Sequence, residues 1–224
     1  MKLRLACVFL LLVCWMAFAQ DSDLSNRASA GDPAAQVKMG NMYAFGQGVP
    51  RSSTEAVKWF RKAAEQGYAE GEYRLGGMYD VGFGVPPDPA TAVKWYLLSA
   101  KQGFPDAEYR LGIMYEQGRG VEQSDAEAGQ WYQRAAGKGR REAQLKLGEM
   151  YEDGRGLPQS YKDAGKWYLE AAEQNQATAQ FKLGRLYDQG LGTPQSTSEA
   201  IKWYRKAIAG GDAEAEEYLR ALEK

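Results

Sequence analysis

The chain has 224 residues, of which 44% are hydrophobic and 25% are charged, as is typical of a folded, soluble protein. Its 28 basic and 29 acidic residues nearly cancel, which excludes the basic excess with which nucleic-acid binders neutralise phosphates. The sequence contains no histidine, the side chain that most often serves as general base and metal ligand. We therefore expect neither a nucleic-acid partner nor a histidine-dependent catalytic or metal site.

Residues 1–19 have the features of a secretory signal peptide. Lys2 and Arg4 precede an apolar run over residues 5–18, which ends in the small-residue pattern Ala-Phe-Ala at 17–19. The run is short for a membrane span, so a retained membrane anchor is the less favoured alternative. We expect export, to the periplasm in preference to full secretion, with membrane contact only during export.

Both cysteines, Cys7 and Cys14, lie inside this leader. Val13 precedes Cys14, whereas a lipoprotein signal needs small residues at that place, so lipid attachment is not expected. The chain beyond the leader has no thiol with which to form a disulfide or to hold a metal ion through sulfur. An exported protein of this kind must be stabilised by packing alone.

A 36-residue repeat organises the rest of the chain. Tryptophan and tyrosine return at this period in five copies, as Trp59, Trp95, Trp131, Trp167 and Trp203, and as Tyr43, Tyr79, Tyr115, Tyr151 and Tyr187. A fixed period of this size predicts a solenoid, in which each repeat packs mainly against its neighbours. We expect an all-α fold, a right-handed α-α superhelix of five helix-turn-helix repeats followed by a C-terminal capping helix.

The expected boundaries follow from this period. Residues 20–31 form an N-terminal cap or linker. Leu24 and Ala28 fall on positions that are apolar in the repeats, as in a degenerate half-repeat. The five repeats occupy residues 32–67, 68–103, 104–139, 140–175 and 176–211. The C-terminal capping helix occupies residues 212–224.

The first helix of each repeat is typified by the one that begins at Pro33, with Asp32 as N-cap and proline at the first helical position. Ala35, Met39 and Tyr43 recur at helical spacing and predict its buried stripe. A glycine returns in the middle of this helix, as Gly40, Gly76, Gly112, Gly148 and Gly184. Because a glycine there costs about 1 kcal/mol relative to alanine, its recurrence predicts that a neighbouring helix passes too close for a side chain.

A Gly-x-Gly pair ends the first helix and permits positive φ angles in the turn. A phosphate-binding loop is not expected, since no strand precedes the pair and no third glycine follows. The second helix is expected to follow an N-cap at Ser52, Asp88, Ser124, Ser160 and Ser196. Its buried face sets small alanines beside Trp59 or Phe60, which allows close helix crossing. Gly67 and its equivalents end this helix, with Asn175 in that place in the fourth repeat.

The recurring residues of the repeat are clearest in its second copy, where they are Leu75-Gly76, Tyr79, Gly82-x-Gly84-Val85, Ala92, Trp95-Tyr96, Ala100 and Gly103. This unit resembles the Sel-1-like repeat, a relative of the tetratricopeptide repeat, over roughly residues 28–224. The resemblance implies an adaptor that scaffolds protein complexes, and its exported bacterial members are associated with envelope processes and host contact. Some exported relatives are cysteine-rich and linked to penicillin binding. This chain lacks their cysteines, so that activity is disfavoured.

By analogy with tetratricopeptide repeats, the first helices line the concave face. One position of these helices differs in every repeat, as Asn41, Gly77, Ile113, Glu149 and Arg185. Such variation is incompatible with a core position and predicts exposure. The candidate partner-binding residues on this face are Tyr73, Tyr109, Ile113, Asp80, Glu116, Glu152, Asp188 and Arg185.

These residues predict a groove with an aromatic floor and acidic rims. Such a groove favours a peptide or helix that carries Lys or Arg beside apolar anchors, so we expect a basic protein or peptide partner. Two alternatives remain open. The acidic residues could pair with the basic column Lys38, Arg74, Arg110, Lys146 and Lys182, two turns earlier, and the aromatic column could belong to the core between repeats.

The residue types favour binding over catalysis. Without histidine, or cysteine beyond the leader, the usual pairs of nucleophile and base are absent, and no Ser-x-x-Lys motif occurs. Two carboxylates could in principle support glycoside hydrolysis, but among 29 acidic residues some suitable pair is expected by chance. We expect a monomeric, exported interaction scaffold that uses no cofactor or metal ion. The alternative is a glycan-binding or cell-wall-remodelling factor whose groove tyrosines stack on sugars.

Overall fold

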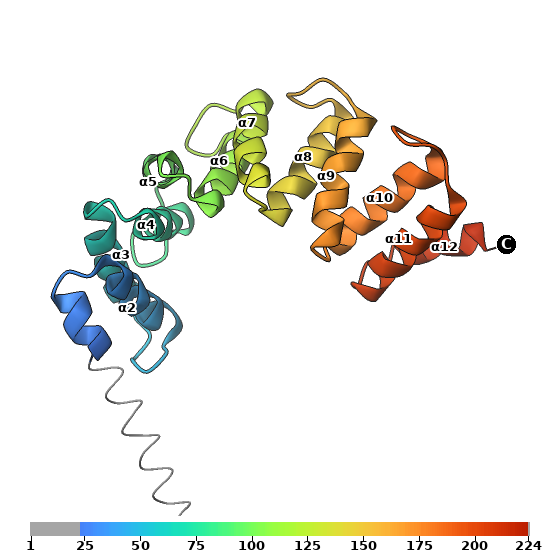
Figure 1. The fold of residues 1–224 in the computed structure, drawn as a ribbon. Helices are drawn as coiled ribbons and strands as arrows, with labels where there is room; N and C mark the ends of the chain where they lie inside the picture. The colour runs from blue at the N-terminus through green and yellow to red at the C-terminus, as the bar shows by residue number, and fades with distance from the viewer. Residues whose placement is uncertain (1–22, 224) are drawn as a thin grey trace, which may run out of the picture. The chain divides into compact units, whose positions relative to one another are not determined.

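The computed structural model describes residues 23–223, which form an all-α solenoid of helical repeats (Figure 1). The expected signal peptide at 1–19 lies outside the described residues. Helices α2 to α11 each contain 13 residues, and α12 contains 8. Between residues 23 and 223 there is no strand, and none of the helices is long and apolar enough to cross a membrane.

The chain divides after Gln102 into two compact units. In the first unit, residues 23–29 are helical. They are followed by α2 (Pro33–Phe45), α3 (Ser53–Glu65), α4 (Ala69–Val81) and α5 (Pro89–Lys101). Within the unit α2 packs against α3, α3 against α4 and α4 against α5, and α2 also contacts α4. Leu24 and Ala28 of the N-terminal segment pack against Ala35 and Met39 of α2.

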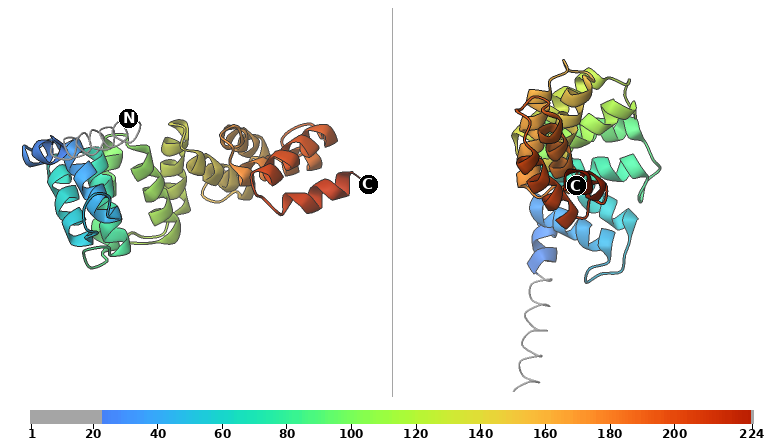
Figure 2. Two further views of the ribbon diagram at one scale, coloured as in Figure 1. Left: turned by 90° about the horizontal axis from the view of Figure 1, so that it is seen from below. Right: turned by 90° about the vertical axis from the view of Figure 1, so that its right-hand side faces the viewer.

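The second unit contains three complete repeats and a final helix. Its elements are α6 (Pro105–Gln117), α7 (Asp125–Gly137), α8 (Arg141–Asp153), α9 (Tyr161–Glu173), α10 (Ala177–Gln189), α11 (Thr197–Ala209) and α12 (Ala215–Leu222). Here too each helix packs against its successor, and Figure 2 shows the helices of this unit from two further directions. The core consists of small clusters that each join neighbouring helices, as expected of a solenoid.

The mid-helix glycines lie against an aromatic ring from the second helix of the same repeat. A Cβ atom on Gly76 would lie 2.8 Å from the ring of Tyr96, and one on Gly184 would lie 2.7 Å from the ring of Tyr204. Tyr96, Tyr132, Tyr168 and Tyr204 are at most 1% exposed. The prediction that a neighbour passes too close for a side chain is therefore confirmed, and that neighbour is a buried ring.

The first helix of the first repeat and the second helices are capped as the sequence predicts, whereas α4, α6, α8 and α10 have no side-chain N-cap hydrogen bond. Asp32 accepts hydrogen bonds from the backbone N–H groups of Ala34 and Ala35, and Ser52 accepts one from Glu55. The N-caps of the other second helices are equivalent to Ser52. Asn175 takes a positive φ of 61°, as the glycines do at the same place in other repeats.

The second glycine of the turn has a further role that the sequence interpretation missed. A Cβ atom on Gly84 would overlap the backbone carbonyl of Ser53, and Gly156 and Gly192 lie in the same way against the starts of α7 and α9. These three turns therefore rest directly on the second helix of the preceding repeat. This close contact, rather than only a permissive backbone, requires glycine there.

A polar clasp, also missed from the sequence, closes the first four repeats. A buried or nearly buried side chain of the first helix accepts a hydrogen bond from the residue that caps the second helix. The donor–acceptor pairs are Gln66–Gln36 (2.8 Å), Gln102–Glu72 (2.8 Å), Lys138–Glu108 (2.6 Å) and Gln174–Gln144 (2.8 Å). Burial raises the pKa of Glu72 against the opposing effect of the hydrogen bond from Gln102. Of these four repeats, the third uses an ion pair in this place.

Candidate binding surface

The candidate residues are shared between the two units. Tyr73 and Asp80 belong to α4 of the first unit. The other six belong to α6, α8 and α10 of the second unit, as Tyr109, Ile113, Glu116, Glu152, Asp188 and Arg185. Within the second unit, α6 is joined to the start of α8 by an ion pair between Asp106 and Arg140 (2.8 Å), which places their surfaces side by side.

The variable position is half-buried in all five repeats, at Asn41, Gly77, Ile113, Glu149 and Arg185. Its neighbours along each helix, such as Gly112 and Leu111, repeat and are buried. In the second unit, the first helices therefore combine a constant framework with half-exposed side chains that differ in shape and charge, Ile113, Glu149 and Arg185, which we call the variable row. Arg185 also carries a buried Nε atom without a hydrogen-bond partner.

The aromatic column is the position of the first helices occupied by Val37, Tyr73, Tyr109, Leu145 and Phe181, and its side chains lie deeper than the floor of a groove would. The ring centroid of Tyr73 lies 5.9 Å from that of Tyr96, that of Tyr109 lies 5.8 Å from that of Tyr132, and Phe181 makes the same contact with Tyr204. Val37 and Phe181 are 2% and 3% exposed, whereas Tyr73 and Tyr109 are half-buried. Burial raises the pKa of the Tyr109 hydroxyl. This column is thus largely core, which was the alternative interpretation of the sequence.

The acidic column is not a row of free carboxylates. The Glu116 carboxylate accepts a hydrogen bond from the Tyr132 hydroxyl (2.7 Å) and another from Arg155 (3.2 Å), and it lies 3.9 Å from the Lys146 ammonium group. Burial alone would raise the pKa of Glu116, but the Tyr132 hydrogen bond and the two cations outweigh it and hold the pKa below its ordinary value. The Glu116 side chain is 16% exposed.

The same arrangement returns one repeat later. The Glu152 carboxylate accepts a hydrogen bond from the Tyr168 hydroxyl and forms an ion pair with Lys182 (3.4 Å). Asp188 accepts one from Tyr204 (3.4 Å). Burial, with the nearby carboxylate, raises the pKa of both Tyr132 and Tyr168 far above the ordinary value, so these hydroxyls remain donors.

We call this series of carboxylate, tyrosine and lysine the acid–tyrosine ladder. Its lysines, Lys146 and Lys182, come from the next repeat, 30 residues along the chain, rather than from two turns earlier in the same helix. The expectation of exposed acidic rims is therefore corrected in the second unit. In the first unit Asp80 is 8% exposed, so it too is largely withdrawn from solvent. Burial and pairing explain both results, because a carboxylate leaves water only with compensating partners.

Among the described residues, no group of three or more acidic side chains is placed to hold a metal ion. The side chains of the candidate surface are half-buried apolar and aromatic groups, and charged groups that are mostly paired. Pairing leaves Ile113 and Arg185 as the candidates whose side chains are half-exposed and vary between repeats.

Comparison with known proteins agrees with this fold. The family model of the Sel1 repeat matches five segments, at 33–68, 69–104, 105–139, 141–176 and 177–212. A protective antigen present in uropathogenic Escherichia coli strains, which displays an SLR fold, is 39% identical with a TM-score of 0.86, over 90% of this chain and 43% of its own. A Sel1 repeat protein from Oxalobacter formigenes is 37% identical with a TM-score of 0.83, over 89% of this chain and 58% of its own.

This chain thus spans less than two thirds of either relative. An immunity protein from Pseudomonas aeruginosa shares the fold at 20% identity, with a TM-score of 0.54 over 85% of this chain and 73% of its own. No curated protein matches the sequence. The five repeat matches and the two relatives show that this chain belongs to the Sel1 repeat family.

Proposed function

We propose that this protein is an exported, non-catalytic interaction module that binds a segment of another protein along the first helices of its repeats. Sel1 repeat proteins commonly mediate protein–protein interactions, and the repeat is generally a non-catalytic scaffold. The observation that carries the proposal is the variable row. In the second unit, a constant framework presents a different half-exposed side chain in each repeat, at Ile113, Glu149 and Arg185, as expected of a surface that recognises an extended partner.

The acid–tyrosine ladder changes the kind of partner that this surface favours. Because Glu116 and Glu152 already have tyrosine and lysine partners, they offer little uncompensated charge to a basic peptide. Apolar contact with Ile113 and an acceptor for Arg185 would contribute more. The partner is then held mainly by shape and hydrogen bonds, and its binding should depend weakly on salt.

The glycan-binding alternative has less support. Stacking on a sugar needs an open aromatic face, but Tyr109 has the ring of Tyr132 at 5.8 Å and the guanidinium group of Arg140 at 5.5 Å. Tyr73 lies in the same way against Tyr96 and Arg74. These contacts occupy the faces that a sugar would use.

Photo-crosslinking tests the binding surface. A photoreactive side chain is placed at Ile113 or Arg185, and as a control at Gln133, which is exposed on the second helix α7. After irradiation in an envelope extract, one discrete protein should be crosslinked from the first two positions and not from Gln133. Equal crosslinking from all three positions, or crosslinking from Gln133 alone, would contradict the proposed surface.

Export is tested separately by fractionation of cells that produce the full chain. The proposal expects a periplasmic protein whose first residue is Gln20, measured by mass spectrometry of the N-terminal peptide. An uncleaved chain in the cytoplasmic fraction would refute export and would leave the proposed surface unaffected.

A further inference from the structure

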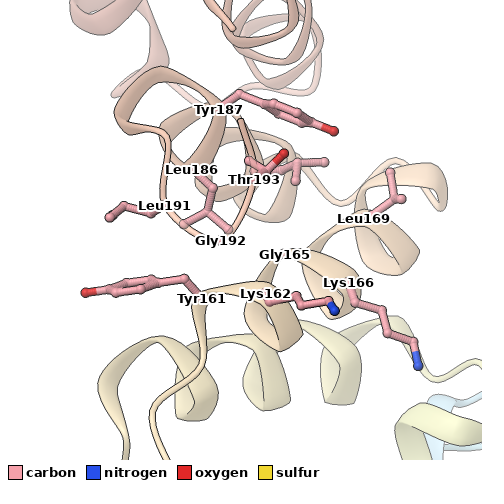
Figure 3. A pocket seen from close by; sticks show the side chains of 11 residues that line it. Tyr161, Lys162, Gly165, Lys166, Leu169, Leu186, Tyr187, Leu191, Gly192 and Thr193 are labelled. Carbon is pink, nitrogen blue, oxygen red and sulfur yellow. The ribbon is translucent and has the colours of Figure 1, made fainter. Parts of the chain in front are cut away.

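A cavity of about 260 Å³ lies between α9 and the turn that follows α10, in the second unit (Figure 3). Gly165 lies on α9, and Leu186 and Thr193 approach from α10 and its turn, as Figure 3 shows. The cavity does not include Arg185, so it is separate from the variable row. It is smaller than the roughly 300–1,000 Å³ of typical small-molecule pockets, and its size suits one large apolar side chain with its main chain.

The cavity lies where one position of the repeat, Gly165, has no side chain and the facing position, Thr193, carries one too short to fill the space. Position 165 corresponds to Val57 in the first repeat, and position 193 corresponds to Val85 in the second. In the first unit Val57 is 4% exposed, and Val85 and Phe83 pack against its cluster, so the equivalent space is filled.

The junction between the third and fourth repeats shows that one loss alone is not sufficient. Gly129 there corresponds to Gly165, but Leu157 stands where Thr193 stands one repeat later. A Cβ atom on Gly129 would lie 3.3 Å from Met150 and 3.4 Å from Leu157, so this space is occupied. A Cβ atom on Gly165 would lie 3.3 Å from a Leu186 methyl group, and within 4 Å it would meet no other described residue beyond its own helix.

Two lysines border the cavity and have no ion-pair partner among the described residues. Lys162 and Lys166 are both exposed, and their ammonium groups lie on the α9 side of the opening in Figure 3. Lys162 replaces Thr54, Ala90, Ala126 and Ser198 of the other repeats, which are all uncharged. A positive charge at this place is therefore particular to the fourth repeat.

Lys166 lacks the ion-pair partner that the equivalent lysines of the first and fifth repeats have. Lys58 pairs with Glu55 (2.7 Å) and Lys202 with Glu199 (3.0 Å), each three residues earlier. The fourth repeat has the shorter Asp163 there, which accepts a hydrogen bond from Ser160 (2.6 Å) instead. The ammonium group of Lys166 lies near the ring of Trp167, at 5.2 Å, and remains available to an outside anion.

We propose that this cavity docks an acidic peptide segment of a partner protein, with one apolar side chain in the cavity and flanking carboxylates on Lys162 and Lys166. The leucines of the cavity supply the apolar contact, and the unpaired cations select the charge of the peptide. This site goes beyond the proposed function, because it uses a different surface and a partner segment of defined charge.

Titration with short peptides, followed by NMR of the full chain, tests the proposal. The probes are acetyl-Glu-Leu-Glu-amide, its neutral analogue acetyl-Gln-Leu-Gln-amide and the basic analogue acetyl-Lys-Leu-Lys-amide. The acidic peptide should give saturable shifts at Gly165, Thr193 and Leu186 with a dissociation constant in the roughly millimolar range expected of so small a ligand. The neutral peptide should bind about fivefold more weakly at low salt. Equal binding of the acidic and basic peptides, or no saturable shift with the acidic one, would overturn the proposal.

Two kinds of variant separate the apolar and charged parts. Gly165→Val restores the side chain of Val57 and should abolish the shifts, while the matched change Gly137→Val, at a helical glycine with open space around it, should leave them intact. Lys162→Gln with Lys166→Gln should lower the affinity for the acidic peptide to that for the neutral one. Circular dichroism confirms that each variant folds, and Thr193→Leu fills the cavity from the other side if Gly165→Val does not fold. Binding that survives a filled cavity in a folded variant would refute the site.

Discussion

Two junctions of the second unit differ in how the turn of one repeat packs against the second helix of the preceding repeat. Between the third and fourth repeats, Leu157 fills the space above Gly129, and between the fourth and fifth, Thr193 leaves the space above Gly165 open. The surrounding framework is the same in both: a mid-helix glycine against a tyrosine, and a carboxylate that accepts from that tyrosine. The comparison teaches that the repeat fixes the backbone, while a pair of facing positions decides whether a junction is closed or forms a cavity.

The largest effect is expected from breaking the framework that both junctions share. A Cβ atom on Gly148 would lie 2.5 Å from the ring of Tyr168. Gly148→Val should therefore lower the free energy of unfolding by about 3 kcal/mol, since the buried ring has no room to move. Urea unfolding measures this, with Gly137→Val as the control, for which no loss is expected. A Gly148→Val protein as stable as the wild type would show that the ring can be displaced at little cost.

A smaller effect is expected from converting the closed junction into the open one. Leu157→Thr should destabilise the protein by about 2 kcal/mol, because a packed apolar group is lost beside Gly129. It should also create a binding site for acetyl-Leu-amide there, measured by NMR. The reciprocal change Thr193→Leu should stabilise the protein. If both changes destabilise it equally, facing positions do not control the cavity.

The acid–tyrosine ladder, present at both junctions, is tested by Tyr132→Phe. Near pH 7 the loss of the hydroxyl should cost about 1 kcal/mol, because Glu116 loses one hydrogen bond. The pKa of Glu116 is lowered in the folded state. Its stabilisation is therefore complete above the unfolded pKa of about 4.3 and is lost as the pH falls through the lower folded pKa.

The difference in stability between wild type and Tyr132→Phe should accordingly shrink below about pH 4. Urea unfolding at several pH values measures this. A difference that stays constant down to about pH 2 would show that the hydroxyl acts through packing and not through the Glu116 carboxylate.

The smallest effect is expected from Asp163→Glu. The longer side chain would restore the ion pair that Lys58 and Lys202 make with Glu55 and Glu199. Such exposed pairs contribute about 0.3 kcal/mol, so stability should hardly change. Affinity for acetyl-Glu-Leu-Glu-amide should fall about twofold, because Lys166 is then shared. Unchanged affinity would remove Lys166 from the docking site.

Periodicity predicted the repeats, the caps and the close approach at the mid-helix glycine, because each of these depends on residues within one repeat. It failed for the acidic column. Glu116 was compared with basic residues of its own helix, whereas its lysine, Lys146, belongs to the next repeat. The spacing of identical columns does not reveal which column of one repeat faces which column of the next.

The cavity, too, could not be predicted from the spacing of residues alone. The glycine at position 165 and the short side chain of Thr193 are both visible in the sequence. Their combination has meaning only once the two positions are known to face each other across a junction, which the structure supplies. The same holds for the polar clasp, whose two partners lie 30 residues apart.

That clasp has a consequence for how such proteins change over generations. In each of the first four repeats both of its partners belong to the same repeat, as with Gln144 and Gln174 or Glu108 and Lys138. A gene segment that encodes one repeat therefore encodes both the donor and the acceptor. Its duplication or deletion leaves neither residue without its hydrogen-bond partner. Arrays built of such repeats can lengthen or shorten without separating the two partners of a clasp.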